Sequence, residues 1–320
     1  MTNSIKDLFN KILAGKKPEN LYRPIEYILT QSGKRLRPQL VSYASRMFGG
    51  DEEGALHIAA AFEMLHNFTL IHDDIMDKAD VRRGEPTVYR KWNTNIAILS
   101  GDALAVMAMQ QLHKLRCDPQ TIIEISEIFT QTALEICEGQ QYDLDFETRD
   151  NVSIDDYVEM VRLKTAVMFA GCLKTGGMFA SADTESLAAL YDLGIHLGIA
   201  FQLADDLLDV YADTEVFGKA VGGDIKDNKK TFVFLKALEL SDSGQKKTLK
   251  ALYSDKKMEE NEKFMKVKAI YDSVGVRKAS EEAIMNYSKL CYEDLKRINA
   301  GDEKKKELVD LVKKLQNREK

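Results

Sequence analysis

Two acidic clusters with the same spacing are the residues of this chain most able to do chemistry. Each places two adjacent aspartates three residues before a third, and together they comprise Asp73, Asp74, Asp77, Asp205, Asp206 and Asp209. In a helix the first and third aspartate of a cluster lie one turn apart, so three carboxylates gather at one helix end. Carboxylates that close repel one another unless a cation balances them. Oxygen ligands without a cysteine or histidine set favour magnesium over zinc.

The repetition of the cluster argues against ordinary solvated helix surface, which is the usual explanation of one acidic run. Both clusters lie at the end of long apolar stretches with helical periodicity, 56–76 and 190–210. Helices of that kind bury one face. We therefore expect the two clusters to form opposing walls of one metal-filled cavity.

Basic residues at several places could bind an anionic ligand beside these metals. Lys34, Arg35 and Arg37 surround a helix junction in SGKRLRPQL, where they suit phosphate oxygens or form a basic surface loop. The glycine- and lysine-rich segment 215–231, with Lys219, Lys229 and Lys230, is either a lid over a phosphate or a solvated turn.

Further polar residues are expected to point toward the same cavity. His66 shares one helical stripe with Asp73, although a satisfied core histidine is the alternative. Ser153 and Asp156 form a capping-box pattern for a helix over 155–170. Lys164 lies on that helix amid apolar neighbours and therefore needs an anionic partner.

Composition limits the class of protein. The chain has 320 residues, 44% hydrophobic, with only 5 prolines and few alternating β-branched runs, which favours one nearly all-helical domain over 1–320. A net charge of -6 excludes a general affinity for nucleic acid. The four cysteines are scattered, as in a reducing cytoplasm. We expect no signal peptide and no transmembrane segment, because no stretch reaches about 18 uncharged apolar residues.

These features together predict an amphipathic substrate. Metals between two carboxylate clusters, with converging lysines and arginines, describe a diphosphate site, and the apolar helices describe a pocket for a hydrocarbon tail. The chemistry that follows is metal-assisted departure of diphosphate, which leaves an allylic carbocation in a dry cavity.

The sequence resembles the trans-isoprenyl diphosphate synthases (polyprenyl synthetases). The resemblance runs from Gly33 to Thr231 and rests on GKRLRP, LIHDDIMD with RRG, GQQYD, LKT, FQLADDLLD and GK…DIKDNK, in matching order. It implies an all-α bundle around a deep central cavity (the isoprenoid synthase type I fold), a homodimer, and three magnesium ions per active site.

The resemblance also implies roles for individual residues. The magnesium ligands would be Asp73, Asp77, Asp205 and Asp209, with Asp74 and Asp206 supporting them. The allylic diphosphate would be bound by Arg82, Lys164 and Lys219. The isopentenyl diphosphate pocket would be formed by Lys34, Arg37, His66 and Arg83. Thr165 and Gln202 would flank the reacting carbons, and secondary roles would fall to Gln140, Asp143 and Lys229.

The implied reaction condenses isopentenyl diphosphate with dimethylallyl, geranyl or farnesyl diphosphate. Phe68 lies five residues before Asp73, where the family places its chain-length-setting bulk, and this implies a geranylgeranyl product; a farnesyl or longer product is the alternative. An ideal helix places Thr69 nearer the aspartate face, so Phe68 as ordinary core stays open.

Rival classes have weaker support. A di-iron bundle would use Glu63 and His66 as a Glu-x-x-His motif, but it needs two such motifs. A prenyl-diphosphate-binding partner subunit would normally have lost a metal or diphosphate ligand, and none is missing. Terpene cyclases usually carry a different second metal motif.

Overall fold

The computed structural model describes residues 2–212, 222–255 and 257–316; Lys219 therefore lies outside the described residues. This part of the chain is almost entirely helical, which confirms the all-α class. Its residues divide into two compact units, unit 1 (1–133, 171–191 and 298–305) and unit 2 (134–170, 192–297 and from 306 onward). The single domain expected over 1–320 stays a prediction.

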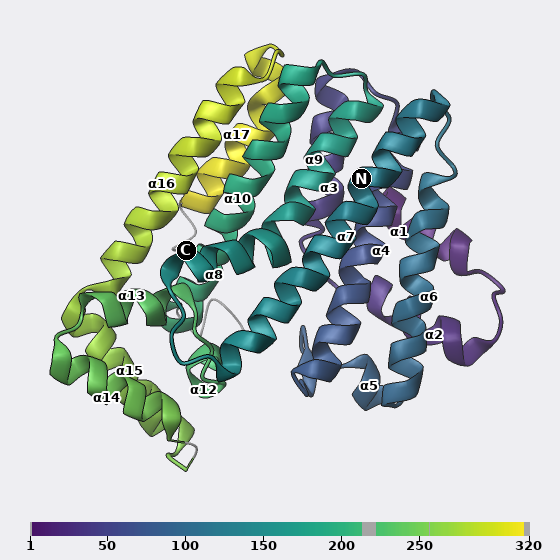
Figure 1. The fold of residues 1–320 in the computed structure, drawn as a ribbon. Coiled ribbons are helices and arrows are strands. Elements are labelled where there is room, and N and C mark those ends of the chain that lie inside the picture. The colour runs from purple at the N-terminus through teal and green to yellow at the C-terminus, as the bar shows by residue number, and fades with distance from the viewer. Residues whose placement is uncertain (1, 213–221, 256, 317–320) are drawn as a thin grey trace. The chain divides into compact units, whose positions relative to one another are not determined.

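Unit 1 is built around one long helix, α4. The elements that lie wholly in this unit are α1 (Thr2–Leu13), α2 (Glu19–Thr30), α3 (Leu36–Met47), α4 (Glu52–Met76), β1 (Val81–Arg82), β2 (Glu85–Pro86), α5 (Val88–Lys91) and α6 (Thr94–Leu112). In Figure 1, α4 and α6 run side by side. They approach closely at Gly101, where an added Cβ would lie 2.4 Å from Nε2 of His72.

Local signals define both ends of α4. Asp51 is the N-cap and accepts a hydrogen bond from the Gly54 N–H at 2.8 Å. Glu52 and Glu53 in the first turn interact favourably with the helix dipole. After Met76 the chain leaves the helix through Lys78, whose φ of 54° is left-handed. The first acidic cluster therefore lies at the C-terminal end of a buried helix.

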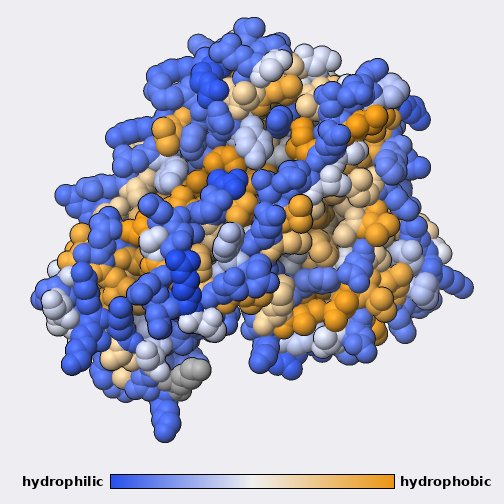
Figure 2. Space-filling model, viewed as in Figure 1, coloured by the Kyte–Doolittle hydropathy of each residue, from blue (hydrophilic) through white to orange (hydrophobic). Residues whose placement is uncertain are grey.

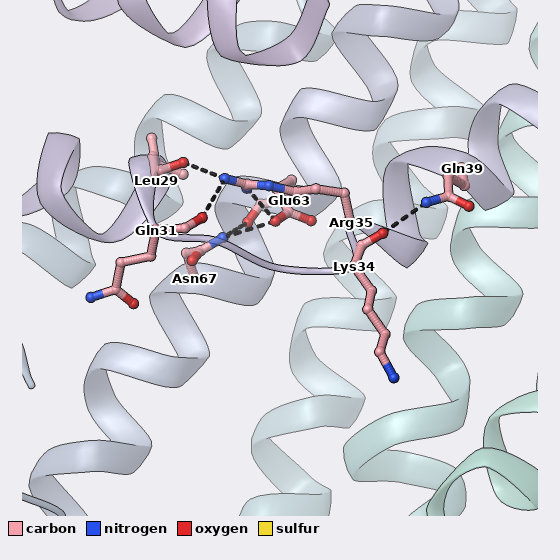
Figure 3. Close-up of polar contacts among 7 residues, drawn as sticks. All are labelled: Leu29, Gln31, Lys34, Arg35, Gln39, Glu63 and Asn67. Carbon is pink, nitrogen blue, oxygen red and sulfur yellow. Dashed lines mark hydrogen bonds and ion pairs between the residues drawn. The ribbon is translucent and has the colours of Figure 1, made fainter. Parts of the chain in front are cut away.

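Arg35 belongs to the interior of unit 1, and the expectation that it helps bind phosphate is wrong. Its side chain is buried and forms an ion pair with Glu63 at 2.5 Å. It also donates hydrogen bonds to the carbonyl oxygens of Leu29 and Gln31, whereas the side chain of Lys34 extends away from this network (Figure 3). The same ion pair occupies Glu63, so the di-iron alternative loses its carboxylate ligand.

Unit 2 contains shorter helices. Those that lie wholly in it are α8 (Ile154–Val161), the π-helix η1 (Arg162–Ala166), α12 (Gly223–Lys226), α13 (Phe232–Leu240), α14 (Ser243–Ser254), α15 (Glu260–Val274) and α16 (Val276–Arg297). Four helices contribute residues to both units: α7 (Pro119–Thr148), α9 (Val167–Phe179), α10 (Thr184–Tyr211) and α17 (Asp302–Gln316). The capping box of Ser153 and Asp156 is confirmed at the start of α8.

The helix expected over 155–170 contains one turn of π-helix, η1. A Cβ at Gly139 of α7 would lie 2.3 Å from the backbone nitrogen of Lys164, and one at Gly198 of α10 would lie 2.4 Å from Cα of Ala166. These glycines allow two helix backbones to approach η1 within unit 2. The widened turn places Lys164 and Thr165 differently from a regular helix.

Among the described residues, α10 alone has the length and hydropathy of a membrane span. In that apolar stretch 56% of the residues are buried inside the protein. Core helices with a buried apolar face also meet these two criteria.

Replacing Arg35 by methionine should destabilise the protein by about 3 kcal/mol, because the buried Glu63 carboxylate would lose its cation. The double variant Arg35→Met/Glu63→Leu should recover at least half of that loss. Urea unfolding followed by circular dichroism measures both, with Lys34→Met on the neighbouring exposed side chain as the control. Equal losses for the control and Arg35→Met would contradict the structural role.

Candidate active site

The first acidic cluster presents its three carboxylates in different environments. Asp74 is 1% exposed, Asp73 is half-buried and Asp77 is exposed. Asp74 accepts a hydrogen bond from Nε of Arg82 at 2.7 Å, while its Oδ2 is buried without a hydrogen-bond partner among the described residues. Burial raises the pKa of Asp74, the Arg82 guanidinium lowers it, and the Asp77 carboxylate raises it further. The expected support of the cluster by Asp74 therefore has a structural basis, since Asp74 holds Arg82 beside it.

A short β-hairpin directs two arginines to different partners. The strands β1 and β2 pair antiparallel with Arg82 opposite Glu85. Arg83 and Gly84 form the connecting turn with φ angles of 56° and 81°, as in two-residue hairpin turns. Arg82 reaches the carboxylate of Asp74, whereas the guanidinium of Arg83 lies 3.4 Å from the position of a Cβ on Gly33.

Cations surround His66 in unit 1. Burial, followed by the charges of Arg37 and Arg83, holds the pKa of His66 well below its usual value, so its imidazole is neutral at pH 7. Burial also lowers the pKa of both arginines. Nη1 of Arg83 is buried and has no hydrogen-bond partner in the described part of the chain. The structure thus brings together Arg37, His66 and Arg83, three of the four residues expected to bind isopentenyl diphosphate. The fourth, Lys34, is exposed and lies three residues before Arg37.

The two residues expected to set chain length are both half-buried. The ring of Phe68 packs edge-to-face against His72 with centroids 4.8 Å apart. Thr69 donates a hydrogen bond from Oγ1 to the carbonyl oxygen of His66 at 2.8 Å. Phe68 therefore makes a specific ring contact on the α4 side that faces α6 at Gly101.

The three carboxylates of the second acidic cluster, in unit 2, also differ in their exposure to solvent. Asp205 is exposed and Asp206 is 3% exposed. Asp209 is half-buried, and its two oxygens accept the backbone N–H groups of Gly223 and Asp224 at 3.2 and 3.0 Å. Burial raises the pKa of Asp206 to about 7 and also raises the pKa of Asp209.

Asp224 adds a fourth carboxylate that the spacing argument missed. Burial raises its pKa well above the usual value, followed by the charges of Asp206 and Asp209. The only sequence signal for it was its place in the DIKDNK motif, because it lies 15 residues beyond Asp209.

The π-helix η1 supplies two of the expected site residues. Lys164 forms an ion pair with Asp143 of α7 at 2.5 Å, which confirms that it has an anionic partner. Thr165 donates a hydrogen bond to Oε1 of Gln202 at 3.3 Å. Gln140 is buried with neither side-chain polar atom partnered among the described residues, and Lys229 is half-buried after α12.

The carboxylates fit a magnesium ion whose remaining ligands are oxygens of water or substrate. Within the described ranges, no three His, Cys, Asp or Glu side chains converge on one metal position. Mg²⁺ typically binds one or two carboxylates and keeps waters or substrate phosphates as its other ligands. The raised pKa values of Asp74, Asp206, Asp209 and Asp224 reflect buried negative charge, which a divalent cation nearby would stabilise.

Comparison with known proteins identifies the family of this chain. The polyprenyl synthetase family model matches residues 18–273. The chain is 42% identical over 255 residues to a geranylgeranyl diphosphate synthase of Sulfolobus acidocaldarius, covering 79% of this chain and 77% of the relative. It is 42% identical over 222 residues to a short chain isoprenyl diphosphate synthase of Methanothermobacter thermautotrophicus, covering 69% and 68%.

A solved structure gives the same result across the whole chain. A crystal structure of a geranylgeranyl pyrophosphate synthase superposes with a TM-score of 0.92 at 40% identity, covering 100% of this chain and 99% of that one. Such neighbours have the all-α isoprenoid synthase fold, and the family depends on magnesium. The chain belongs to the polyprenyl synthetase family and is a trans-prenyltransferase.

Proposed function

We propose that this enzyme condenses isopentenyl diphosphate with dimethylallyl, geranyl and farnesyl diphosphate to give geranylgeranyl diphosphate. The names of the relatives support the product. The observation that carries the substrate class is the buried Nη1 of Arg83, which lacks a protein acceptor among the described residues. A buried guanidinium needs an anionic partner, and diphosphate oxygens suit its forked geometry.

In this proposal the isopentenyl diphosphate binds to Arg37 and Arg83, with Lys34 at the entrance. His66 stays neutral because burial, followed by the charges of the nearby arginines, lowers its pKa, so it would donate a hydrogen bond without adding charge. Binding an anionic group here would offset the repulsion between the two half-buried arginines.

The allylic diphosphate is proposed to bind through magnesium ions held by aspartates of the two acidic motifs. Asp73, Asp77, Asp205 and Asp209 would hold three magnesium ions, which when bound stabilise the charge on the departing diphosphate. Lys164 would exchange Asp143 for a diphosphate oxygen, and Arg82, Lys219 and Lys229 would bind the same group. Oxygens of Thr165 and Gln202 would face the allylic cation and steady its charge.

Removing one metal-binding carboxylate should suppress turnover. Asp77→Asn and Asp205→Asn should each lower kcat about 100-fold, because fewer carboxylates would remain to bind magnesium at the leaving group. The measurement is incorporation of labelled isopentenyl diphosphate with and without a chelator. Asp80→Asn, at an exposed aspartate paired with Arg90 at 2.5 Å, is the matched control. Full activity of both test variants would refute the metal assignment.

Product length should respond to the side chain at position 68. Phe68→Ala should lengthen the product by at least one five-carbon unit, because it removes bulk about 7.5 Å along the helix axis from Asp73. Thr69→Phe should shorten the product, because it adds bulk on the α4 face that carries Thr69. Chromatography of the dephosphorylated alcohols measures both. An unchanged length with Phe68→Ala would assign Phe68 to the core, and a wild-type farnesyl or longer product would replace the geranylgeranyl assignment.

We also propose a homodimer through α6. Leu99 and Val106 are 60% and 62% exposed and lie seven residues apart, on one helical face. Figure 2 shows hydrophobic side chains among hydrophilic ones on the viewed face, in the region of α6. A cytoplasmic location is part of the proposal, and the four free cysteines support it.

The double variant Leu99→Glu/Val106→Glu should shift the protein from dimer to monomer, because charges would be buried in the interface. Light scattering after size-exclusion chromatography measures the mass. Met265→Glu, at a 64% exposed apolar residue of α15, should stay dimeric. A monomeric wild type, or a dimer unaffected by both charges, would contradict this interface.

A further inference from the structure

Tyr157 is a buried tyrosine whose hydroxyl contacts the second acidic cluster. It lies in the first turn and a half of α8, directly after the capping box of Ser153 and Asp156. Its side chain is 3% exposed and packs in the hydrophobic core of unit 2. Within that core its hydroxyl donates a hydrogen bond to Oδ2 of Asp206. The tyrosine ring thus stabilises the core, while its hydroxyl reaches a residue of the aspartate motif.

The carboxylate of Asp206 collects hydrogen bonds from three separate segments. Besides Tyr157, the backbone N–H of Phe232 donates to Oδ2 at 3.2 Å. Nε2 of Gln202, one helical turn earlier on α10, donates to Oδ1 at 3.0 Å. Tyr157 and the Phe232 N–H together fix Oδ2 of Asp206, and this directs Oδ1 toward Gln202.

This arrangement decides how the amide of Gln202 is oriented. A glutamine amide has a donor and an acceptor end of nearly the same shape, so only its partners distinguish the two orientations. In the structure the amide nitrogen of Gln202 faces Asp206 and donates to its Oδ1 at 3.0 Å. The amide oxygen of Gln202 then faces Thr165, which donates to it at 3.3 Å.

We propose that Tyr157 is a positioning residue of this prenyltransferase, which acts through Asp206 to aim the amide oxygen of Gln202. The proposal rests on the proposed role of Gln202 beside the reacting carbons. A carbonyl oxygen aimed at a developing cation stabilises it, whereas an amide nitrogen aimed the same way opposes it. Loss of the Tyr157 hydroxyl frees the Asp206 carboxylate to rotate and lets the Gln202 amide reorient.

Tyr157→Phe is the direct test, because it keeps the ring in the core and removes only the hydroxyl. We expect kcat to fall about tenfold, the size of one lost buried hydrogen bond. The KM for isopentenyl diphosphate should change less than about twofold, because the affected interaction is made in the transition state. Tyr271→Phe is the matched control, since that 1% exposed tyrosine of the same core bonds only to the hydroxyl of Tyr253 among the described contacts; it should keep the wild-type kcat.

A double-mutant cycle separates positioning from a general effect on the core. If Tyr157 acts through Gln202, then Tyr157→Phe should add less than about twofold to the loss caused by Gln202→Leu. Multiplicative losses in the double variant, or a wild-type kcat for Tyr157→Phe, would overturn the proposal. Should Tyr157→Phe fail to fold, Asp206→Asn tests the same series of contacts from Tyr157 to Gln202. An amide at position 206 can both donate and accept, so it no longer fixes the orientation of the Gln202 amide.

A crystal structure of Tyr157→Phe provides a readout that does not depend on activity. We expect the Gln202 side chain to lose its hydrogen bond to Asp206 or to Thr165, and unchanged contacts would overturn the positioning role. If the wild type itself forms no prenyl product, the proposed function fails, and this structural comparison still decides whether Tyr157 orients Gln202.

Discussion

Crowding of carboxylates at helix ends is the constraint on which the rest of this structure depends. Both acidic clusters solve it in the same way. The middle aspartate of each, Asp74 or Asp206, is buried and accepts at least one hydrogen bond from a protein donor. Exposed aspartates, Asp77 and Asp205, lie beside it. Burial alone would drive such groups toward the neutral form. The internal hydrogen bonds therefore keep each cluster organised.

The arginines of unit 1 also differ in whether the protein itself satisfies their charge. Arg35 is neutralised by Glu63 and by two backbone carbonyls, so it stabilises the junction between α2 and α3. Arg83, on a tight hairpin turn, keeps a buried guanidinium nitrogen without a described protein acceptor. The difference follows from geometry, because a buried charge is tolerated only where a partner is supplied.

Backbone irregularity has a clear function in unit 2. The π-helical turn η1 lies where Gly139 and Gly198 let two other helices approach it closely. A side chain at either glycine would overlap backbone atoms, so the close approach depends on both glycines. Lys164 and Thr165 lie on this turn, and their partners come from the two approaching helices, α7 and α10.

The sequence by itself determined the all-helical class, the two acidic clusters, the need of Lys164 for an anion and the family, because these depend on residue type, periodicity and motif order. Only the tertiary structure decided that Arg35 belongs to the core, that Asp224 joins the second cluster, that a π-turn interrupts the helix before α9, and that Tyr157 reaches Asp206. Tyr157 and Asp206 are 49 residues apart. Local periodicity carries no information about contacts at that separation, since they arise from the packing of one helix against another.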